Sequence, residues 1–438
     1  MVYIITKIQS LPWTNYLYCL IPVLLWMLVF LRFDILIQLW QKITTLQDLY
    51  SPIIAVILCC FGLEILVAGF FKRELLSIGL ISMAIWGVIS CRQHCRAKKD
   101  KVTVLGWFIS CVLLAVFPLL PVVGRETNYN LVVLGGLATI YCGISTFRRL
   151  PALKTATFSC EKYVHYIQIC SVVSAIFIVK STSISISIKE GLPYLNQIFS
   201  WIILGGSVFI PMFSSTKILH RLLSIGLAFI PPYILLSISQ EALFVVCLCW
   251  LLHYWLRLEN LIGGPEKQKK LEDMDFDNKP DISESQRYLL LEDIRRAFYY
   301  IFFILTGFFG TGNIASINSF EPASVYCFLT VFNPFVMGAL MLLKNILPLI
   351  LVSCSFHAIH IITSVPTRAL FLLVLIMSDF MALNFFFLVR DYGSWLEIGT
   401  SISHYIIVMC MNIFLMMLFV VSQILTSFKL FNKKHHCN

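Results

Sequence analysis

The sequence is poor in charge. Only 13% of its 438 residues are Asp, Glu, Lys or Arg, where soluble domains carry roughly 25%. The apolar fraction is 59%, and the apolar residues gather in long runs. Because a membrane-spanning helix needs about 20 consecutive apolar residues, this shortage of charge excludes a soluble globular enzyme. It predicts an all-α fold, a polytopic transmembrane helical bundle.

Two further signals are absent. No Asn-x-Ser/Thr sequon occurs in the chain, so nothing indicates a large glycosylated luminal domain. The first apolar run is not followed by the small-residue pattern of a signal-peptide cleavage site, so we expect it to remain as a span.

Apolar runs bounded by charged residues, Pro or Gly predict about 12–15 spans. We expect a front membrane bundle of about nine spans at 1–256 and a rear bundle of about five spans with a basic tail at 297–438. Between them, a charged cytosolic linker at 257–296 holds eight Lys/Arg and ten Asp/Glu, too polar to fold alone. The expected spans lie near 16–31, 52–71, 75–90, 102–123, 131–147, 163–180, 198–213, 218–239, 242–256, 297–310, 322–343, 345–364, 367–389 and 402–428.

The net charge of +10 follows the topology. Basic residues gather in alternate loops, at 91–101, 148–162 and 217–221, and in the linker. The positive-inside rule makes these loops cytosolic, and no basic face of a soluble module indicates nucleic acid. Continued alternation would put the tail with Lys429, Lys433 and Lys434 on the luminal side, so we expect one rear span to be miscounted or re-entrant.

Candidate metal sites are weak. Most of the 15 cysteines lie inside apolar runs, where they act as small hydrophobic residues. Cys91 and Cys95 flank a His, but no second ligand pair follows, so a juxtamembrane loop is favoured over a metal site. His357 and His360 share a helix face with Ser353 and Ser364; interhelical hydrogen bonding is favoured over metal binding. We expect no catalytic and no metal-ligating residues in this chain.

Five residues are candidates for lipid or substrate contact. The polar, glycine-containing segment 310–321 holds Asn313, Asn318 and Glu321; irregular backbone at membrane depth is tolerated where it lines a cavity, although an ordinary loop is the simpler interpretation. Asp379 lies within an expected span, where an ionised group is costly and marks either function or an ion pair. Arg390 lies near the junction of the last two spans.

Four stretches carry a resemblance to a known family: FPLLPVVGRETNYNLVVLGG at 117–136, GLPYLNQIFSW at 191–201, LEDIRRAFYYIFFILTGFFGTGNIASINSFEPASVYCFLTVFNPFVMGALM at 291–341 and MSDFMALNFFFLVRDYGSWLEIGTSISHYIIVM at 377–409. They resemble the C-terminal membrane domain of the PIG-N type GPI ethanolamine phosphate transferases. The resemblance runs over nearly the whole chain.

The resemblance implies an activity for the complete protein. The family transfers phosphoethanolamine from phosphatidylethanolamine to the first mannose of the GPI precursor in the endoplasmic reticulum membrane. Its luminal catalytic domain, similar to alkaline phosphatases, holds the threonine nucleophile and a divalent metal, expected to be zinc. The resemblance therefore implies that this chain, as a fragment, truncated isoform or incomplete gene model, lacks that domain and any cofactor, and acts as a lipid-embedded scaffold for the two lipids.

An alternative of a different class is a membrane transporter or lipid scramblase without chemistry of its own. Glu64, Asp379 and the polar stripe at 353–364 would supply the polar site that such a protein needs near the bilayer midplane. A third alternative is a product with no role.

Overall fold

The described residues of the computed structural model are mainly helical. These are 26–27, 30–31, 37, 50–91, 98–120, 127–149, 160–262, 271, 274–276, 291–310, 322–365 and 367–428. Within these ranges an isolated β-bridge joins Lys217 to Asp275, and no longer strand forms. The predicted all-α fold is confirmed.

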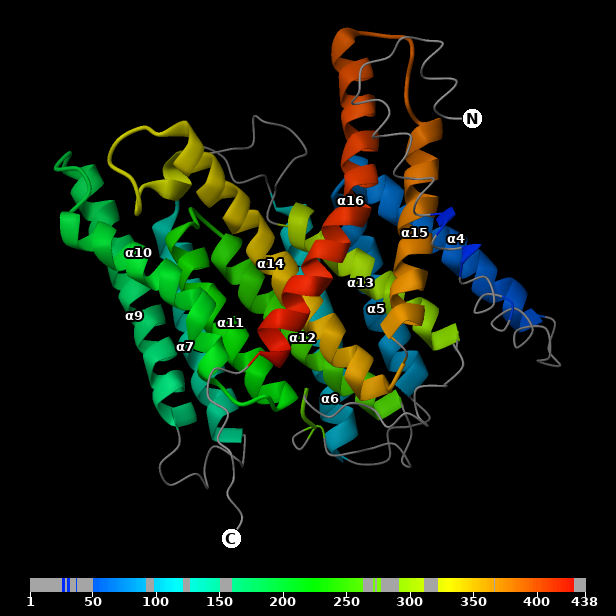
Figure 1. Ribbon diagram of the computed structural model, residues 1–438, viewed down its shortest axis with the longest axis horizontal. Helices are drawn as coiled ribbons and strands as arrows, with labels where there is room; N and C mark the ends of the chain where they lie inside the picture. Colours follow the sequence, from blue (N-terminus) through cyan, green and yellow to red (C-terminus); the bar gives the residue numbers. More distant parts are fainter. Residues whose placement is uncertain are drawn as a thin grey trace. The chain divides into compact units, whose positions relative to one another are not determined.

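The helices keep the labels of Figure 1. Their bounds are α4 Tyr50–Phe71, α5 Glu74–Cys91, α6 Lys98–Val116, η1 Phe117–Leu119, α7 Tyr129–Arg149, α9 Cys160–Ser187, α10 Tyr194–Phe209, η2 Ile210–Phe213, α11 Ile218–Leu235, α12 Glu241–Ile262, α13 Leu291–Phe309, η5 Pro322–Val325, α14 Pro334–Thr363, α15 Thr367–Phe387 and α16 Trp395–Ser427.

Ten helical segments in the described part of the chain are long and apolar enough to cross a membrane, so the protein is multi-pass. Helix α4 adds a shorter apolar segment at Cys60–Phe71. The first expected span, 16–31, lies almost entirely outside the described residues. The total of 12–15 spans therefore stays a prediction.

The chain forms two compact units. The first unit comprises residues 1–76, 280–305 and 364–418, and the second comprises 77–279, 306–363 and 419–438. Each unit thus combines segments from both sides of the charged stretch 257–296. The two units do not test the predicted domain bounds at 256 and 297, which stay a prediction.

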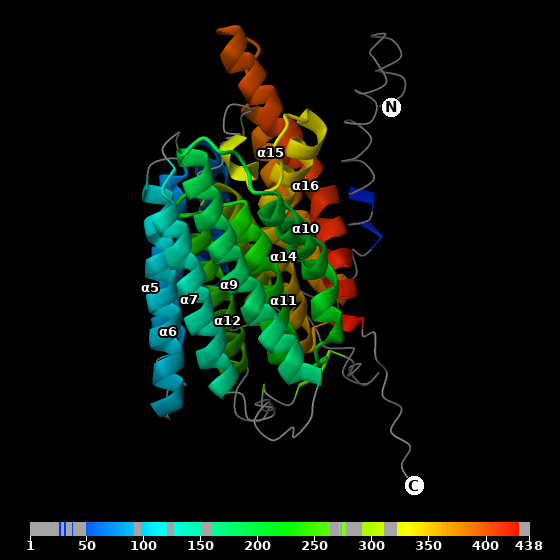
Figure 2. The ribbon, with the colours of Figure 1, turned by 90° about the vertical axis from the view of Figure 1, so that its left-hand side faces the viewer.

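In the second unit, α12 is the central helix. It packs against α6, α7, α11 and α14, while α9 packs against α7, α10 and α11; Figure 2 shows these helices side by side. Helices α7 and α12 approach closely because a Cβ at Gly135 would lie 2.8 Å from the Ala242 side chain and 3.0 Å from the Leu243 backbone nitrogen. A side chain at Gly135 would force the two helices apart.

The first unit contains α4, most of α13, α15 and most of α16. Helix α4 packs against α15. Phe70 meets the rings of Phe385 and His404 edge to face, with centroids 5.1 and 5.6 Å apart. This aromatic cluster supplies a large part of the buried apolar contact at that end of α4.

The second unit has two ends with different charge. Successive helices run in opposite directions (Figure 2), so Cys91, Arg148 and Ile218 lie at one end, beside the lysine- and arginine-rich loops. We name it the basic end. The opposite end, where α9 meets α10 and α11 meets α12, is named the distal end. By the positive-inside rule, the basic end is predicted to be cytosolic and the distal end luminal.

The prediction of two separate spans at 322–343 and 345–364 was wrong. A single helix, α14, runs from Pro334 to Thr363 and continues past Lys344. Lys344 looks like a span boundary in the sequence, yet its ammonium is buried and lies 2.7 Å from a Glu241 carboxylate oxygen. Pro348 is also accommodated inside the helix, as neighbouring helices in membrane bundles allow. Four helices, α13 to α16, therefore follow the charged stretch, where five spans were expected.

The end of α16 lies at the basic end of the second unit. Arg221, near the start of α11, donates to the carbonyls of Leu425 and Phe428 at the end of α16. The last described residue thus lies at the basic end, and the basic sequence that follows it obeys the positive-inside rule. The expected miscounted rear span is α14.

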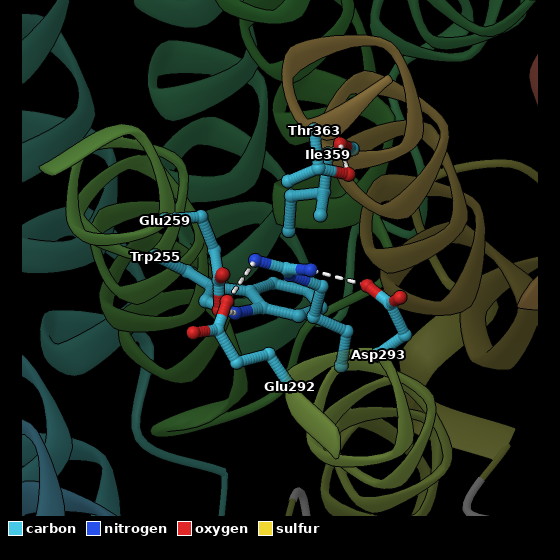
Figure 3. Close-up of polar contacts among 7 residues, drawn as sticks. Trp255, Glu259, Glu292, Asp293, Ile359 and Thr363 are labelled. Carbon is cyan, nitrogen blue, oxygen red and sulfur yellow. Dashed lines mark hydrogen bonds and ion pairs between the residues drawn. The ribbon is translucent and has the colours of Figure 1, made fainter. Parts of the chain in front are cut away.

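Both ends of the predicted linker are helical, since α12 continues to Ile262 and α13 begins at Leu291. Glu259, Asp293 and Arg296 are buried there, and each has a polar partner within a helical turn. Arg296 donates to Asp293 and, at 3.1 Å, to Glu292. The Trp255 indole donates to Glu259 at 3.3 Å. Figure 3 shows both sets of contacts.

Candidate polar site at the distal end

The five predicted contact residues lie in different places. Asn313, Asn318 and Glu321 lie outside the described residues. Asp379 is buried in α15, and Arg390 follows the end of that helix at the surface. The structure does not bring Asp379 and Arg390 together, so it forms no common site from them.

Asp379 is paired with an amide, and within the described part of the chain no Lys or Arg forms an ion pair with it. The Asn412 side-chain nitrogen donates to Asp379 Oδ1 at 2.5 Å. The other carboxylate oxygen and Asn412 Oδ1 are buried, and neither has a hydrogen-bond partner among the described residues. Burying two acceptors inside a bundle costs free energy unless a donor reaches them. Such a donor could come from a bound lipid or substrate, and the contact role of Asp379 stays a prediction.

Arg390 belongs to a surface cluster. Its guanidinium lies 3.5 Å from the Glu397 carboxylate, and both side chains are more than half exposed. Trp395 and Tyr392 are 91% and 75% exposed, as expected for an interfacial aromatic belt. An exposed pair of this kind contributes little to stability.

The polar stripe on α14 is used in packing. His357 Nδ1 lies 2.9 Å from the Thr426 hydroxyl of α16, and its ring stacks on Phe276. Within the described ranges, no cluster of three or more His, Cys, Asp and Glu could hold a metal ion. The predicted interhelical hydrogen bond is therefore present at His357.

The most heavily buried ion pair between helices joins α12 to α14. Glu241, the first residue of α12, is 4% exposed, and Lys344 of α14 is 8% exposed. Their side-chain atoms Oε1 and Nζ lie 2.7 Å apart. Removing two charges from water costs several kcal/mol per ion, and ionisable groups inside membrane bundles are functional-site candidates for that reason.

The turn before Glu241 is fixed by hydrogen bonds. The Ile238 backbone N–H donates to the second Glu241 oxygen at 3.1 Å. The Ile238 carbonyl in turn accepts from the Asn128 N–H at 3.1 Å. Glu241 therefore holds both the Lys344 ammonium and the backbone between α11 and α12, so its carboxylate has little freedom to move.

Segment 322–333 is fastened to α10 beside this site. The Phe328 carbonyl accepts from Gln197 Nε2 at 2.8 Å and from Trp201 Nε1 at 3.2 Å. Asn333 then caps α14 by accepting from the backbone of Phe335 and Val336. Segment 322–333 therefore lies at the distal end of the bundle.

Cys327 provides a test of this placement. Burial raises the pKa of its thiol to about 12, so the thiolate is scarce at neutral or mildly alkaline pH. At pH 8.5 we expect maleimide to modify Cys327 roughly three orders of magnitude more slowly than an ordinary thiol with a pKa near 8.5. Peptide mass spectrometry after timed labelling measures this rate at one position.

Thr330, three residues further on, is exposed, so Thr330→Cys is a matched control that should label quickly, and faster as the pH rises. Equal labelling of Cys327 and Thr330→Cys would show that segment 322–333 does not pack against the bundle.

Two charged residues of this site stand out in the sequence. Lys344 is the single basic residue between 322 and 366, and Glu241 interrupts a long apolar stretch. Both were interpreted as span boundaries because a charge usually ends an apolar run. Their pairing across helices is invisible in a one-dimensional pattern.

Comparison with known proteins identifies the family. The family model described as phosphatidylinositolglycan class N (PIG-N) matches residues 1–394. The chain belongs to the PIG-N family. No solved structure matches it. The predicted resemblance is confirmed.

Curated relatives support the PIG-N assignment. The chain is 45% identical to GPI ethanolamine phosphate transferase 1 of Homo sapiens over 97% of its own length, and 46% identical to that of Mus musculus over 97%. The Aspergillus oryzae relative is 31% identical over 96%. The chain spans only 44–45% of the length of these relatives.

Proposed function

We propose that this chain is the membrane-embedded part of a phosphoethanolamine transferase of GPI-anchor biosynthesis in the endoplasmic reticulum membrane. In the complete protein, phosphoethanolamine passes from phosphatidylethanolamine to the first mannose of the GPI precursor. The chemistry and its divalent metal, zinc by family resemblance, belong to a luminal domain outside these residues. In this proposal the membrane helices of the chain hold the two lipids.

The buried Glu241–Lys344 pair at the distal end is the observation that carries this proposal. Phosphoethanolamine is a zwitterion, with a phosphate and an ammonium that complement a Lys and a carboxylate. We assign the phosphate to Lys344, whose ammonium can donate three hydrogen bonds, and the ethanolamine ammonium to Glu241. Holding the donor lipid here raises its effective concentration at the reaction centre.

Activity of charge variants tests the assignment. In the complete protein, Lys344→Met and Glu241→Gln should each lower transfer to the GPI precursor in isolated microsomes by roughly tenfold or more, since a hydrogen bond to a charged group contributes about 1.5–3 kcal/mol. Lys101→Met removes an exposed lysine at the basic end and should leave transfer unchanged. Full activity in both site variants, at normal protein levels, would contradict the proposal.

Segment 310–321 gives a second test. Replacing Asn313 or Asn318 by Leu should weaken transfer in the complete protein at unchanged expression, because each change removes an amide that can bind a headgroup or glycan. The measurement is again microsomal transfer, with immunoblots for protein level. Unaltered transfer in both variants would remove the segment from the substrate site.

The alternative, a lipid scramblase or transporter, rests on the two unpartnered oxygens of Asp379 and Asn412 in the first unit. Purified protein in liposomes separates the two classes. The scaffold proposal expects no lipid or solute flux above empty liposomes, and restored mannose modification when the luminal domain is supplied. Rapid flux that Asp379→Leu abolishes would support the alternative.

A further inference from the structure

A small polar cavity lies at the basic end of the second unit, between α9, the residues after η2, and α11. Six of its eight lining residues are polar: His165, Gln168, Ser214, Ser215, His220 and Ser224. About 20 Å³ is open to the centre of a water-sized molecule, enough for one or two oxygen atoms. Polar groups inside an otherwise apolar bundle need hydrogen-bond partners, and several of these find them in one another or in the backbone.

His165 is held in place and yet incompletely satisfied. Its ring is 5% exposed and stacks on Phe147 with centroids 4.5 Å apart. Its Nε2 has no hydrogen-bond partner among the described residues. Gln168, one turn further along α9, donates to the Ser224 hydroxyl at 2.8 Å and to the Ser224 carbonyl at 3.0 Å. The cavity wall is therefore rigid, with one buried nitrogen left for a ligand.

The charge around the cavity favours an anion. None of its eight described lining residues is acidic, and Lys217 directly precedes the first residue of α11, where the helix dipole is positive. Among the described residues, the acidic Asp275 lies close to this region, because its backbone forms a bridge with that of Lys217. Arg221 is committed to backbone carbonyls, and Arg148 and Lys162 lie near the ends of α7 and α9.

The depth of the cavity matches lipid headgroups. His165 lies five residues after the start of α9, about 8 Å along the helix at 1.5 Å per residue, and His220 is in the first turn of α11. The headgroup region of one leaflet has a similar thickness of several ångströms. A phosphate at this depth can place one or two oxygens in the cavity while the rest stays at its mouth.

We propose that this cavity binds a phosphate group, supplied by a membrane phospholipid in the leaflet at the basic end or by free phosphate. His165 Nε2, His220 and the Ser215 hydroxyl donate to the phosphate oxygens. The site lies at the end of the second unit opposite the Glu241–Lys344 pair, so it stands independently of the proposed transfer function.

Lipid-dependent stability of the full-length protein in dodecyl maltoside tests the site. Titrations use dioleoyl phosphatidic acid, dioleoylglycerol with the same acyl chains but no phosphate, and inorganic phosphate. We expect phosphatidic acid to raise the unfolding temperature in a saturable manner and dioleoylglycerol to have no effect. A shift with inorganic phosphate as well identifies a site open to free phosphate; a shift with phosphatidic acid alone identifies the lipid as the source.

Two variants connect the shift to the cavity. His165→Phe keeps the stack on Phe147 and removes the nitrogen without a partner, so the ligand-free protein should remain folded while apparent affinity for phosphatidic acid falls roughly tenfold or more. His220→Gln should weaken binding in the same direction. His253→Phe, on α12 and outside the cavity, is the matched control and should bind like the unaltered protein.

Two results would overturn the proposal. One is an equal shift with dioleoylglycerol, which would show that acyl chains alone stabilise the protein. The other is an unchanged titration in both His165→Phe and His220→Gln, because the phosphate would then bind elsewhere.

Discussion

Replacing Arg221 with Leu is expected to destabilise the protein by about 3–5 kcal/mol, the cost typical of breaking a buried charged contact. The side chain is 0% exposed. Its Nε donates to the Leu425 carbonyl at 2.8 Å, and its terminal nitrogens donate to the carbonyls of Pro211 and Phe428. Leucine would remove the donor from the Leu425 and Phe428 carbonyls, at a cost of about 1–3 kcal/mol for an acceptor that water cannot reach, while the Pro211 carbonyl keeps its bonds from Ser214.

Thermal unfolding in detergent, together with limited proteolysis near the end of α16, measures this effect. Cleavage should begin earlier in the Arg221→Leu protein because the last turn of α16 loses its anchor. Arg221→Lys should rescue little, since an ammonium cannot reach carbonyls on both sides as a planar guanidinium does. Arg148→Leu, an exposed arginine at the same end, is the control. An unfolding temperature within 1–2 °C of the unaltered protein, on the order of 0.5 kcal/mol, would show that Arg221 is not an anchor.

The second large effect concerns the Glu241–Lys344 pair. Glu241→Leu or Lys344→Leu alone should destabilise the protein by about 3–5 kcal/mol, because each leaves the other charge buried without a partner. The double variant should lie within about 1–2 kcal/mol of the unaltered protein, since a buried pair is often replaceable by apolar residues. A double-mutant cycle on unfolding free energy measures the coupling.

The double variant also separates structure from function. If the pair binds phosphoethanolamine, the doubly substituted protein should be stable and inactive in transfer. A stable double variant with full activity would show that the pair only joins the two helices and does not bind the headgroup. Additive single effects, with no coupling, would contradict the ion pair itself.

Much of the fold was predictable because long apolar runs determine membrane helices almost alone. The expected spans 75–90 and 131–147 correspond to α5, Glu74–Cys91, and α7, Tyr129–Arg149. The prediction failed at Lys344, where a charge inside an apolar run was interpreted as a boundary. Only the three-dimensional contact with Glu241 makes that lysine acceptable within a helix.

The candidate site was less predictable than the fold. The interhelical hydrogen bonding predicted for the stripe on α14 is confirmed at His357, which contacts Thr426, because a helical period places its residues on one face; Ser353 bonds instead to the Leu349 carbonyl of its own helix. Arg221 and Glu241 were passed over, since their partners are a backbone carbonyl 204 residues away and a lysine on another helix. Partners so distant in sequence leave no local pattern.

The anchoring of α16 by Arg221 has a consequence for the order of biosynthesis. Arg221 and Leu425 are separated by 204 residues, which take roughly 10–40 s to synthesise at about 5–20 residues per second. During that interval the arginine of a newly inserted α11 lacks the carbonyls of α16. The second unit therefore completes the hydrogen bonds of Arg221 only after α16 has been synthesised, and a chain interrupted before residue 425 leaves this arginine without the carbonyls of α16.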